Sequence, residues 1–92
     1  MSNKQFLIID FGASWCGPCK MFAPVFEKVK ADYSGSYDFK KVDVDEESDL
    51  AQKFNIFSVP TVVAIKDGKE VARVSGYMSE AQFVKFLNEK CV

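Results

Sequence analysis

Two cysteines three positions apart, Cys16 and Cys19, are the residues of this sequence best suited to chemistry. They lie in the stretch ASWCGPCKMF, residues 13–22, within otherwise ordinary hydrophobic sequence. A close cysteine pair can be a redox couple, part of a metal site or a structural disulfide. These three interpretations have to be separated by the rest of the chain.

The remaining cysteine and histidine content weakens the metal interpretation. The chain has no histidine and one further cysteine, Cys91, near its end. A structural zinc site needs four Cys or His ligands. We therefore predict no metal, and we interpret Cys91 as an incidental thiol close to a frayed terminus, since chain ends are usually poorly held.

The N-terminal sequence bears on the redox compartment. The apolar run at residues 6–9 ends at Asp10 and is too short for the core of a signal peptide or for a membrane span. We therefore expect a cytoplasmic protein. Thiols are kept reduced there, so a cysteine pair is more often catalytic or metal-binding than a permanent disulfide.

Length and composition define the class of protein. At 92 residues, with 48% hydrophobic residues, the chain is predicted to be one globular domain, residues 1–92. Basic and acidic residues number 12 and 13, giving a net charge of −1. Neither a nucleic-acid surface nor a polybasic membrane anchor is supported by this balance.

Periodicity and turn signals predict seven elements around the cysteines. A buried strand precedes the pair, and a helix with Pro18 at its start and a kink at Pro24 follows it. Asp67-Gly68 predicts a hairpin turn, and Ser79 with Gln82 predicts a capped terminal helix. The expected elements are a strand at 5–11, a helix to about 33, a strand at 38–45, a short helix at 46–55 ending at Asn55, two hairpin strands after Pro60, and a helix at 79–90.

This order, β-α-β-α-β-β-α, predicts an α/β fold. A right-handed crossover makes the first two strands parallel, and the hairpin completes a four-stranded mixed sheet with helices on both faces. In this arrangement Cys16 stands at a helix N-terminus, where the helix dipole and free N–H groups favour a thiolate. Cys19 lies one turn further, shielded by the helix. We expect Cys16 to attack a disulfide and Cys19 to resolve the product.

Several segments together resemble the thioredoxin family. These are IIDFGASWCGPCK, KKVDVDE, FNIFSVPTVVAIKDGK and SGYMSEAQFVKFL, which follow one another at the family's spacing and cover nearly the whole chain. The resemblance implies a thiol-disulfide oxidoreductase that reduces disulfides in other proteins. It also implies that the chain binds no cofactor and receives electrons from NADPH through a flavin-containing thioredoxin reductase.

The resemblance also assigns roles around the cysteines. Asp10 matches a buried carboxylate that takes the proton of Cys19, and Lys41 matches a lysine beside it; both residues could instead be solvated strand charges. Pro60 matches a cis-proline facing the pair. The substrate-binding residues implied are Trp15, Gly17, Pro18, Val59, Pro60, Gly76 and Tyr77, with Val59 pairing with substrate backbone, Gly76 leaving room for it, and Trp15 and Tyr77 giving apolar contact.

The chain departs from the family pattern in two places. Gly12 stands where the family usually has a tryptophan, which predicts looser packing under the active site. Only four residues precede Gln5, where the family has a further strand and helix, so we expect residues 39–43 to form a sheet edge. Lys40 and Lys41 would defend that edge against pairing, and we expect a monomer. A Cys91 disulfide is an alternative, oxidation-dependent route to dimers.

Two other functions stay open at this point. The fold could serve as a binding module in which the cysteines are incidental, or as a glutaredoxin-like protein that uses glutathione. The sequence CGPC argues against the glutathione-dependent alternative, and serine variants of both cysteines would test the binding module.

Overall fold

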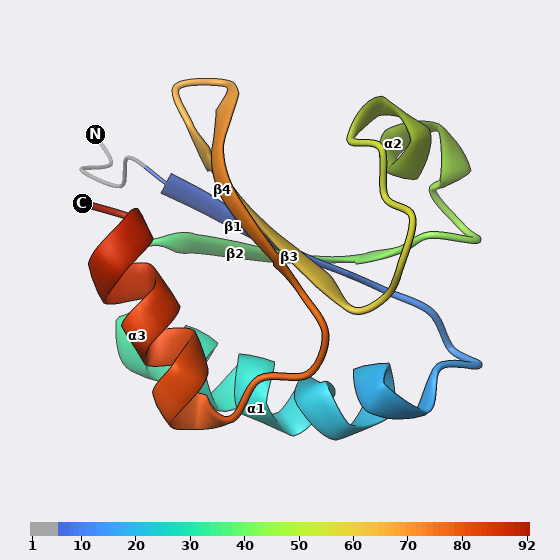
Figure 1. Cartoon of the computed structure of the whole chain (residues 1–92). Coiled ribbons are helices and arrows are strands. Elements are labelled where there is room, and N and C mark those ends of the chain that lie inside the picture. Colours follow the sequence, from blue (N-terminus) through green and yellow to red (C-terminus); the bar gives the residue numbers. More distant parts are fainter. Residues whose placement is uncertain (1–5) are drawn as a thin grey trace.

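The computed structural model describes residues 6–92, so Gln5, the expected start of the first strand, and the residues before it lie outside the described part. The elements follow the predicted order (Figure 1). They are β1 (Phe6–Gly12), α1 (Gly17–Tyr33), β2 (Asp38–Asp43), α2 (Ser48–Lys53), β3 (Thr61–Lys66), β4 (Lys69–Ser75) and α3 (Glu80–Lys90).

The four strands form one mixed sheet in the order β2-β1-β3-β4. Strand β1 is parallel to β2 and antiparallel to β3, and β3 is antiparallel to β4. The α/β prediction and its strand directions are therefore confirmed. The predicted edge is confirmed for residues 6–92: among their strands β2 lies at one border of the sheet, where Lys40 and Lys41 are exposed.

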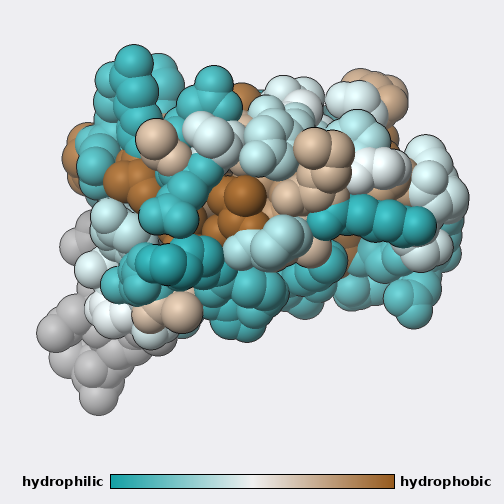
Figure 2. Space-filling model, turned by 90° about the horizontal axis from the view of Figure 1, so that it is seen from below, coloured by the Kyte–Doolittle hydropathy of each residue, from teal (hydrophilic) through white to brown (hydrophobic). Residues whose placement is uncertain are grey.

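Helices cover both faces of this sheet, as predicted. Helices α1 and α3 lie on one face and α2 on the other (Figure 1). The larger core cluster joins β1 and β3 to α1 and α3, and it includes Phe22, Phe26 and Phe83, all nearly inaccessible to solvent. On the outer surface of α1 and α3, hydrophilic residues predominate, with hydrophobic residues visible between them (Figure 2). The two helices are therefore amphipathic, and their apolar sides pack against the sheet.

Local sequence signals explain the element boundaries. Asp67 and Gly68 both have positive φ, 52° and 79°, as the predicted hairpin turn requires. Ser79 caps α3, and both hydrogen bonds of the predicted capping box with Gln82 are present. Asn55, which follows the C-cap residue Phe54 of α2, has φ 53°, the left-handed conformation predicted for it. Pro24 lies inside α1, which continues past it to Tyr33.

Cys91 is the clearest correction to the sequence prediction. Its side chain is buried in the larger core cluster, and its backbone N–H donates to the carbonyl of Leu87 at the end of α3. Burial raises the pKa of the thiol to about 11. The expectation of a thiol near a frayed end is wrong, and a buried, protonated thiol does not support the oxidation-dependent dimer. No helix within residues 6–92 has the length and apolarity needed to cross a membrane.

Candidate active site

The cysteine pair lies where β1 passes into α1. Cys16 is the N-cap of α1, with an extended backbone at φ −94° and ψ 114°, and its sulfur accepts the N–H of Cys19 at 3.2 Å. The two Cα atoms are 5.2 Å apart and the sulfurs form a disulfide. A sulfur at this position faces the unpaired N–H groups of the helix start, which stabilise negative charge on it.

The expected difference in exposure between the two cysteines is absent. In the disulfide, Cys16 is 5% exposed and Cys19 is 8% exposed. Cys16 loses exposure because it packs with Ala13, Val44 and Val59, and its sulfur lies 3.7 Å from the carbonyl oxygen of Val59. Solvent exposure alone therefore does not distinguish an attacking from a resolving cysteine.

The loop before β3 brings Val59, the residue before Pro60, against the cysteines. The Val59–Pro60 peptide bond is cis, as the resemblance implied, and the Pro60 carbonyl accepts the N–H of Gly76 at 2.8 Å. Gly76 has φ 99°, which explains the glycine, and no neighbouring atom would obstruct a side chain there.

Thr61 holds this loop in place, and the sequence analysis missed it. Thr61 is buried; its hydroxyl donates to the carbonyl of Ser58 at 2.7 Å and lies 3.0 Å from the hydroxyl of Ser75. The bonds tie the loop to both β3 and β4. The sequence did carry a signal for this residue: Thr61 is a polar residue directly after a proline and before an apolar run.

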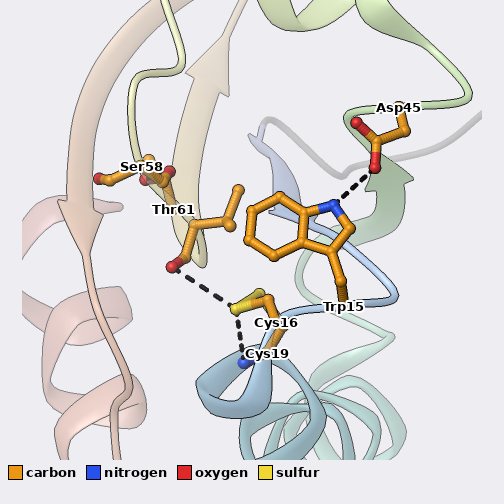
Figure 3. The surroundings of a disulfide bond; sticks show 7 residues. Trp15, Cys16, Cys19, Asp45, Ser58 and Thr61 are labelled. Carbon is orange, nitrogen blue, oxygen red and sulfur yellow. Dashed lines mark hydrogen bonds between the residues drawn. A yellow bond between two sulfur atoms is a disulfide. The ribbon is translucent and has the colours of Figure 1, made fainter.

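Trp15 stands beside the disulfide at the surface. It is 67% exposed, and its indole N–H donates to Asp45 at 2.7 Å (Figure 3). The Asp45 loop is itself ordered, because the carboxylate of Asp43 accepts the N–H groups of Asp45 and Glu46. Asp45 is a second residue that the sequence analysis missed, since a bond across 30 positions leaves no local signal.

Apolar side chains extend the surface around Trp15. A groove of about 290 Å³ is lined by Trp15, Phe57 and Val59 among others, and Phe57 is 92% exposed. Tyr77 is exposed above α1, where its ring contacts Phe22 edge to face. Gly17 and Pro18 are exposed in the first turn of α1. Of the residues predicted to bind substrate, Val59 packs against the cysteine pair, while Trp15, Gly17 and Pro18 adjoin the cysteines in sequence.

Asp10 is buried in the middle of β1. It is 2% exposed, and its Oδ1 has no hydrogen-bond partner within residues 6–92. Burial raises the pKa of this carboxyl from 3.8 to about 6, with Lys41 lowering it and Glu27 raising it further. A group with such a pKa exchanges protons near neutral pH. The alternative of a solvated strand charge is wrong for Asp10.

Lys41 fits both interpretations of the sequence, a lysine beside the buried carboxylate and a solvated strand charge. It lies opposite Asp10 in the register of β1 and β2, and its charge acts on that carboxyl. Its own side chain is exposed to solvent. It is thus a solvated strand charge that still influences the buried acid.

Gly12, the residue that departs from the family pattern, borders a cavity of about 590 Å³. Asp10, Cys19 and Lys41 line the same cavity. A Cβ at Gly12 would lie 3.5 Å from both Cβ and Sγ of Cys19. The looser packing expected at Gly12 corresponds to this cavity, which Gly12 and Cys19 both line. No group of three or more potential metal ligands occurs among the described residues.

Comparisons with known proteins agree on one family. The family model described as Thioredoxin matches residues 1–89. Curated thioredoxins of several Staphylococcus aureus strains are 44% identical over 82 residues, which are 89% of this chain and 79% of theirs.

Two solved structures have the same fold. Thioredoxin NaTrxh from Nicotiana alata matches with a TM-score of 0.84 and 44% identity, over 95% of this chain and 75% of that one. The X-ray structure of Fasciola hepatica thioredoxin matches with a TM-score of 0.88 and 37% identity, over 97% and 84%.

Proposed function

The chain belongs to the thioredoxin family and is a thiol-disulfide oxidoreductase that uses the Cys16–Cys19 couple, and we propose the roles of the residues around that couple. The observation that carries the proposal is the position of the pair. One sulfur caps a helix beside an exposed apolar groove, and the other lines a cavity with a buried acid.

Reduction of a substrate disulfide begins at Cys16 in this proposal. The helix N-terminus and the N–H of Cys19 stabilise its thiolate, which attacks one substrate sulfur and expels the other as a thiolate. Cys19 then attacks Cys16 in the mixed disulfide, which closes the protein disulfide and releases the second substrate thiolate. Asp10, ionised above about pH 6, accepts the proton that Cys19 loses. Lys41 tunes the pKa of Asp10 through its charge.

Substrate is held by backbone pairing and apolar contact. Val59 is half-buried with its carbonyl beside the Cys16 sulfur, a position suited to pairing with an extended substrate segment. Trp15 and Tyr77 offer exposed apolar surface. Gly17, Pro18, Pro60 and Gly76 shape the approach without large side chains. Because backbone and apolar contacts are not sequence-specific, we propose a broad range of protein substrates.

The proposal also covers the source of electrons, the oligomeric state and the cellular compartment. The dithiol chemistry needs no bound cofactor, and we propose that NADPH supplies electrons through a flavin-containing thioredoxin reductase. We further propose that residues 1–92 act as one domain and as a monomer in the cytoplasm. Support for a monomer comes from the exposed lysines of the β2 edge, which oppose strand pairing.

Insulin reduction coupled to NADPH oxidation through a thioredoxin reductase tests this function. The wild-type protein is expected to catalyse the reaction, and a double variant with Cys16→Ser and Cys19→Ser is expected to be inactive. Equal activity of the double variant would assign the cysteines an incidental role, as in a binding module. Turnover with glutathione but with none of several thioredoxin reductases would indicate glutaredoxin-like chemistry instead.

A further inference from the structure

The cavity beside Gly12 has no part in the binding of protein substrates described above. Its volume of about 590 Å³ falls within the roughly 300–1,000 Å³ typical of small-molecule pockets. Cys19 is among the residues that line it, and Cys16 is not. The cavity therefore gives access to one end of the disulfide, the end opposite to the apolar groove.

The absence of a side chain at Gly12 keeps this access open. A Cβ there would already be in van der Waals contact with the Cys19 sulfur at 3.5 Å, and a larger side chain would extend into the same region. Cys19 is at least as exposed as Cys16 in the disulfide. A small reagent can thus approach the Cys19 sulfur from the cavity.

The charges around the cavity favour a cation. Four carboxylate residues and two lysines line it, so acidic groups prevail. The buried Asp10 is one of these acids, and its Oδ1 has no hydrogen-bond partner within the described residues. The acids are Asp10, Asp43, Glu46 and Glu47, and the lysines are Lys20 and Lys41.

We propose that this cavity is a binding site for small aminothiols, which reduce the protein disulfide by attacking Cys19. The ammonium group of such a molecule is held by the acidic lining, and its sulfur reaches the Cys19 sulfur. The inference rests on the dithiol couple of the proposed function and adds a second route by which that couple is reduced.

The chemistry favours attack at this sulfur. A small thiolate attacks Sγ of Cys19 and forms a mixed disulfide there, while the bond to Cys16 breaks and Cys16 leaves as a thiolate. Cys16 is the better leaving group, because the start of α1 and the N–H of Cys19 stabilise its charge. A second small thiolate attacks the outer sulfur of the mixed disulfide, releasing Cys19 and a small-molecule disulfide. Two electrons enter the protein, and the protons lost by the small thiols pass to its cysteines or to solvent.

The test compares how three thiols reduce the oxidised protein: cysteamine, neutral 2-mercaptoethanol and anionic glutathione. Rates are taken by acid quenching, alkylation of the freed cysteines and mass spectrometry, and are expressed per thiolate. Gly12→Trp is expected to fill the cavity, and so to lower the cysteamine rate about tenfold and the glutathione rate much less. The reason is that the electrostatic field of an acidic cavity concentrates cationic ligands by about tenfold or more. Gly12→Ala, which adds only a Cβ, should give a smaller decrease in the same direction.

Gly35→Ala is the matched control, because Gly35 is exposed and a Cβ there meets no atom within 4 Å. It should leave all three rates unchanged. Insulin reduction by each variant is measured in parallel, so that a loss of the proposed function is recognised separately. The inference is overturned if insulin reduction persists while the folded Gly12 variants, Gly12→Ala included, keep the wild-type cysteamine rate, or if glutathione is the fastest of the three thiols.

Discussion

The two sides of the Cys16–Cys19 disulfide differ in chemical character although the two residues are almost equally buried. On the Cys16 side lie Trp15, Phe57 and the carbonyl of Val59, which form an apolar groove with one backbone acceptor. On the Cys19 side lies a cavity lined by charged groups, with Asp10 at the most buried position. The groove side suits the docking of a chain, and the cavity side suits the handling of protons and small molecules.

This difference shows that the two sulfurs are separated by their neighbours and not by their exposure. A helix N-terminus stabilises charge at Cys16, whereas a buried acid of raised pKa is available beside Cys19. Each of the following predictions changes one side of the pair and leaves the other intact.

Asp10→Asn should have the largest effect, because it removes the only buried acid on the cavity side within residues 6–92. The closure of the mixed disulfide by Cys19 should slow by at least about tenfold, as expected when a general base is lost. The first attack by Cys16 should be unchanged. Stopped-flow measurement of the two phases with a disulfide-bonded substrate separates them, and equal slowing of both phases would argue against a proton role for Asp10.

The same variant should be more stable at neutral pH. The pKa of Asp10 is about 6 in the fold and 3.8 ordinarily, so ionisation of the folded protein costs about 3 kcal/mol. Below about pH 4 the carboxyl is protonated in both states and there is no penalty. Wild-type stability should therefore fall as pH rises from about 4 to 6 and stay lower above that range. Urea titrations should show this decline in the wild type and in an exposed control, Glu89→Gln, and lose it in Asp10→Asn.

Thr61→Val should have the next largest effect, on the groove side. The change keeps the shape of the side chain but removes the hydroxyl that bonds Ser58 and Ser75. Ser58 and Ser75 are exposed and can bond to water instead, so the change should cost only the net value of the lost bonds, about 0.5–1.5 kcal/mol of the free energy of unfolding. Ser75→Ala removes one of the two partners and should cost less in the same urea titration. A Thr61→Val protein as stable as the wild type would mean that the loop before β3 is held by other contacts.

Lys41→Met sharpens the comparison on the cavity side. Lys41 lowers the pKa of Asp10, so its loss should raise that pKa above about 6 and shift the pH dependence of mixed-disulfide closure to higher pH. Lys40→Met is the matched control, since Lys40 is the neighbouring exposed lysine of β2 and lies opposite Ile9. NMR titration of the Asp10 carboxyl in both variants measures the effect. A shift of equal size in the two variants would assign it to net charge rather than to position.

Asp45→Ala should have the smallest effect. It removes the acceptor of the Trp15 indole N–H, an exposed bond whose loss should cost less than about 1 kcal/mol of stability. The indole should become more mobile, which fluorescence anisotropy of Trp15 would report. A weaker apparent affinity for insulin with unchanged closure of the mixed disulfide would confirm that Trp15 acts on the groove side alone.

Much of this arrangement was predictable because local signals specify it. The hairpin at Asp67-Gly68, the capped start of α3 and the cysteine pair before α1 each depend on residues close together in sequence. Asp45 was not predictable, because its partner Trp15 is set by tertiary packing. Thr61 had a local signal, its place between a proline and an apolar run, but that signal did not specify the bond to Ser75 on β4. Cys91 was misjudged for the same reason: its burial follows from the docking of α3 against the sheet and not from its distance to the chain end.

The assignment of attack to Cys16 is tested most directly by trapping the mixed disulfide with a disulfide-bonded protein such as insulin. Cys19→Ser is expected to accumulate a covalent complex through Cys16, seen on non-reducing gels and located by mass spectrometry. Cys16→Ser is expected to accumulate none, because Cys19 lines the cavity and not the apolar groove where the substrate chain is proposed to bind. Comparable trapping through Cys19 would contradict the division between the two sides of the disulfide.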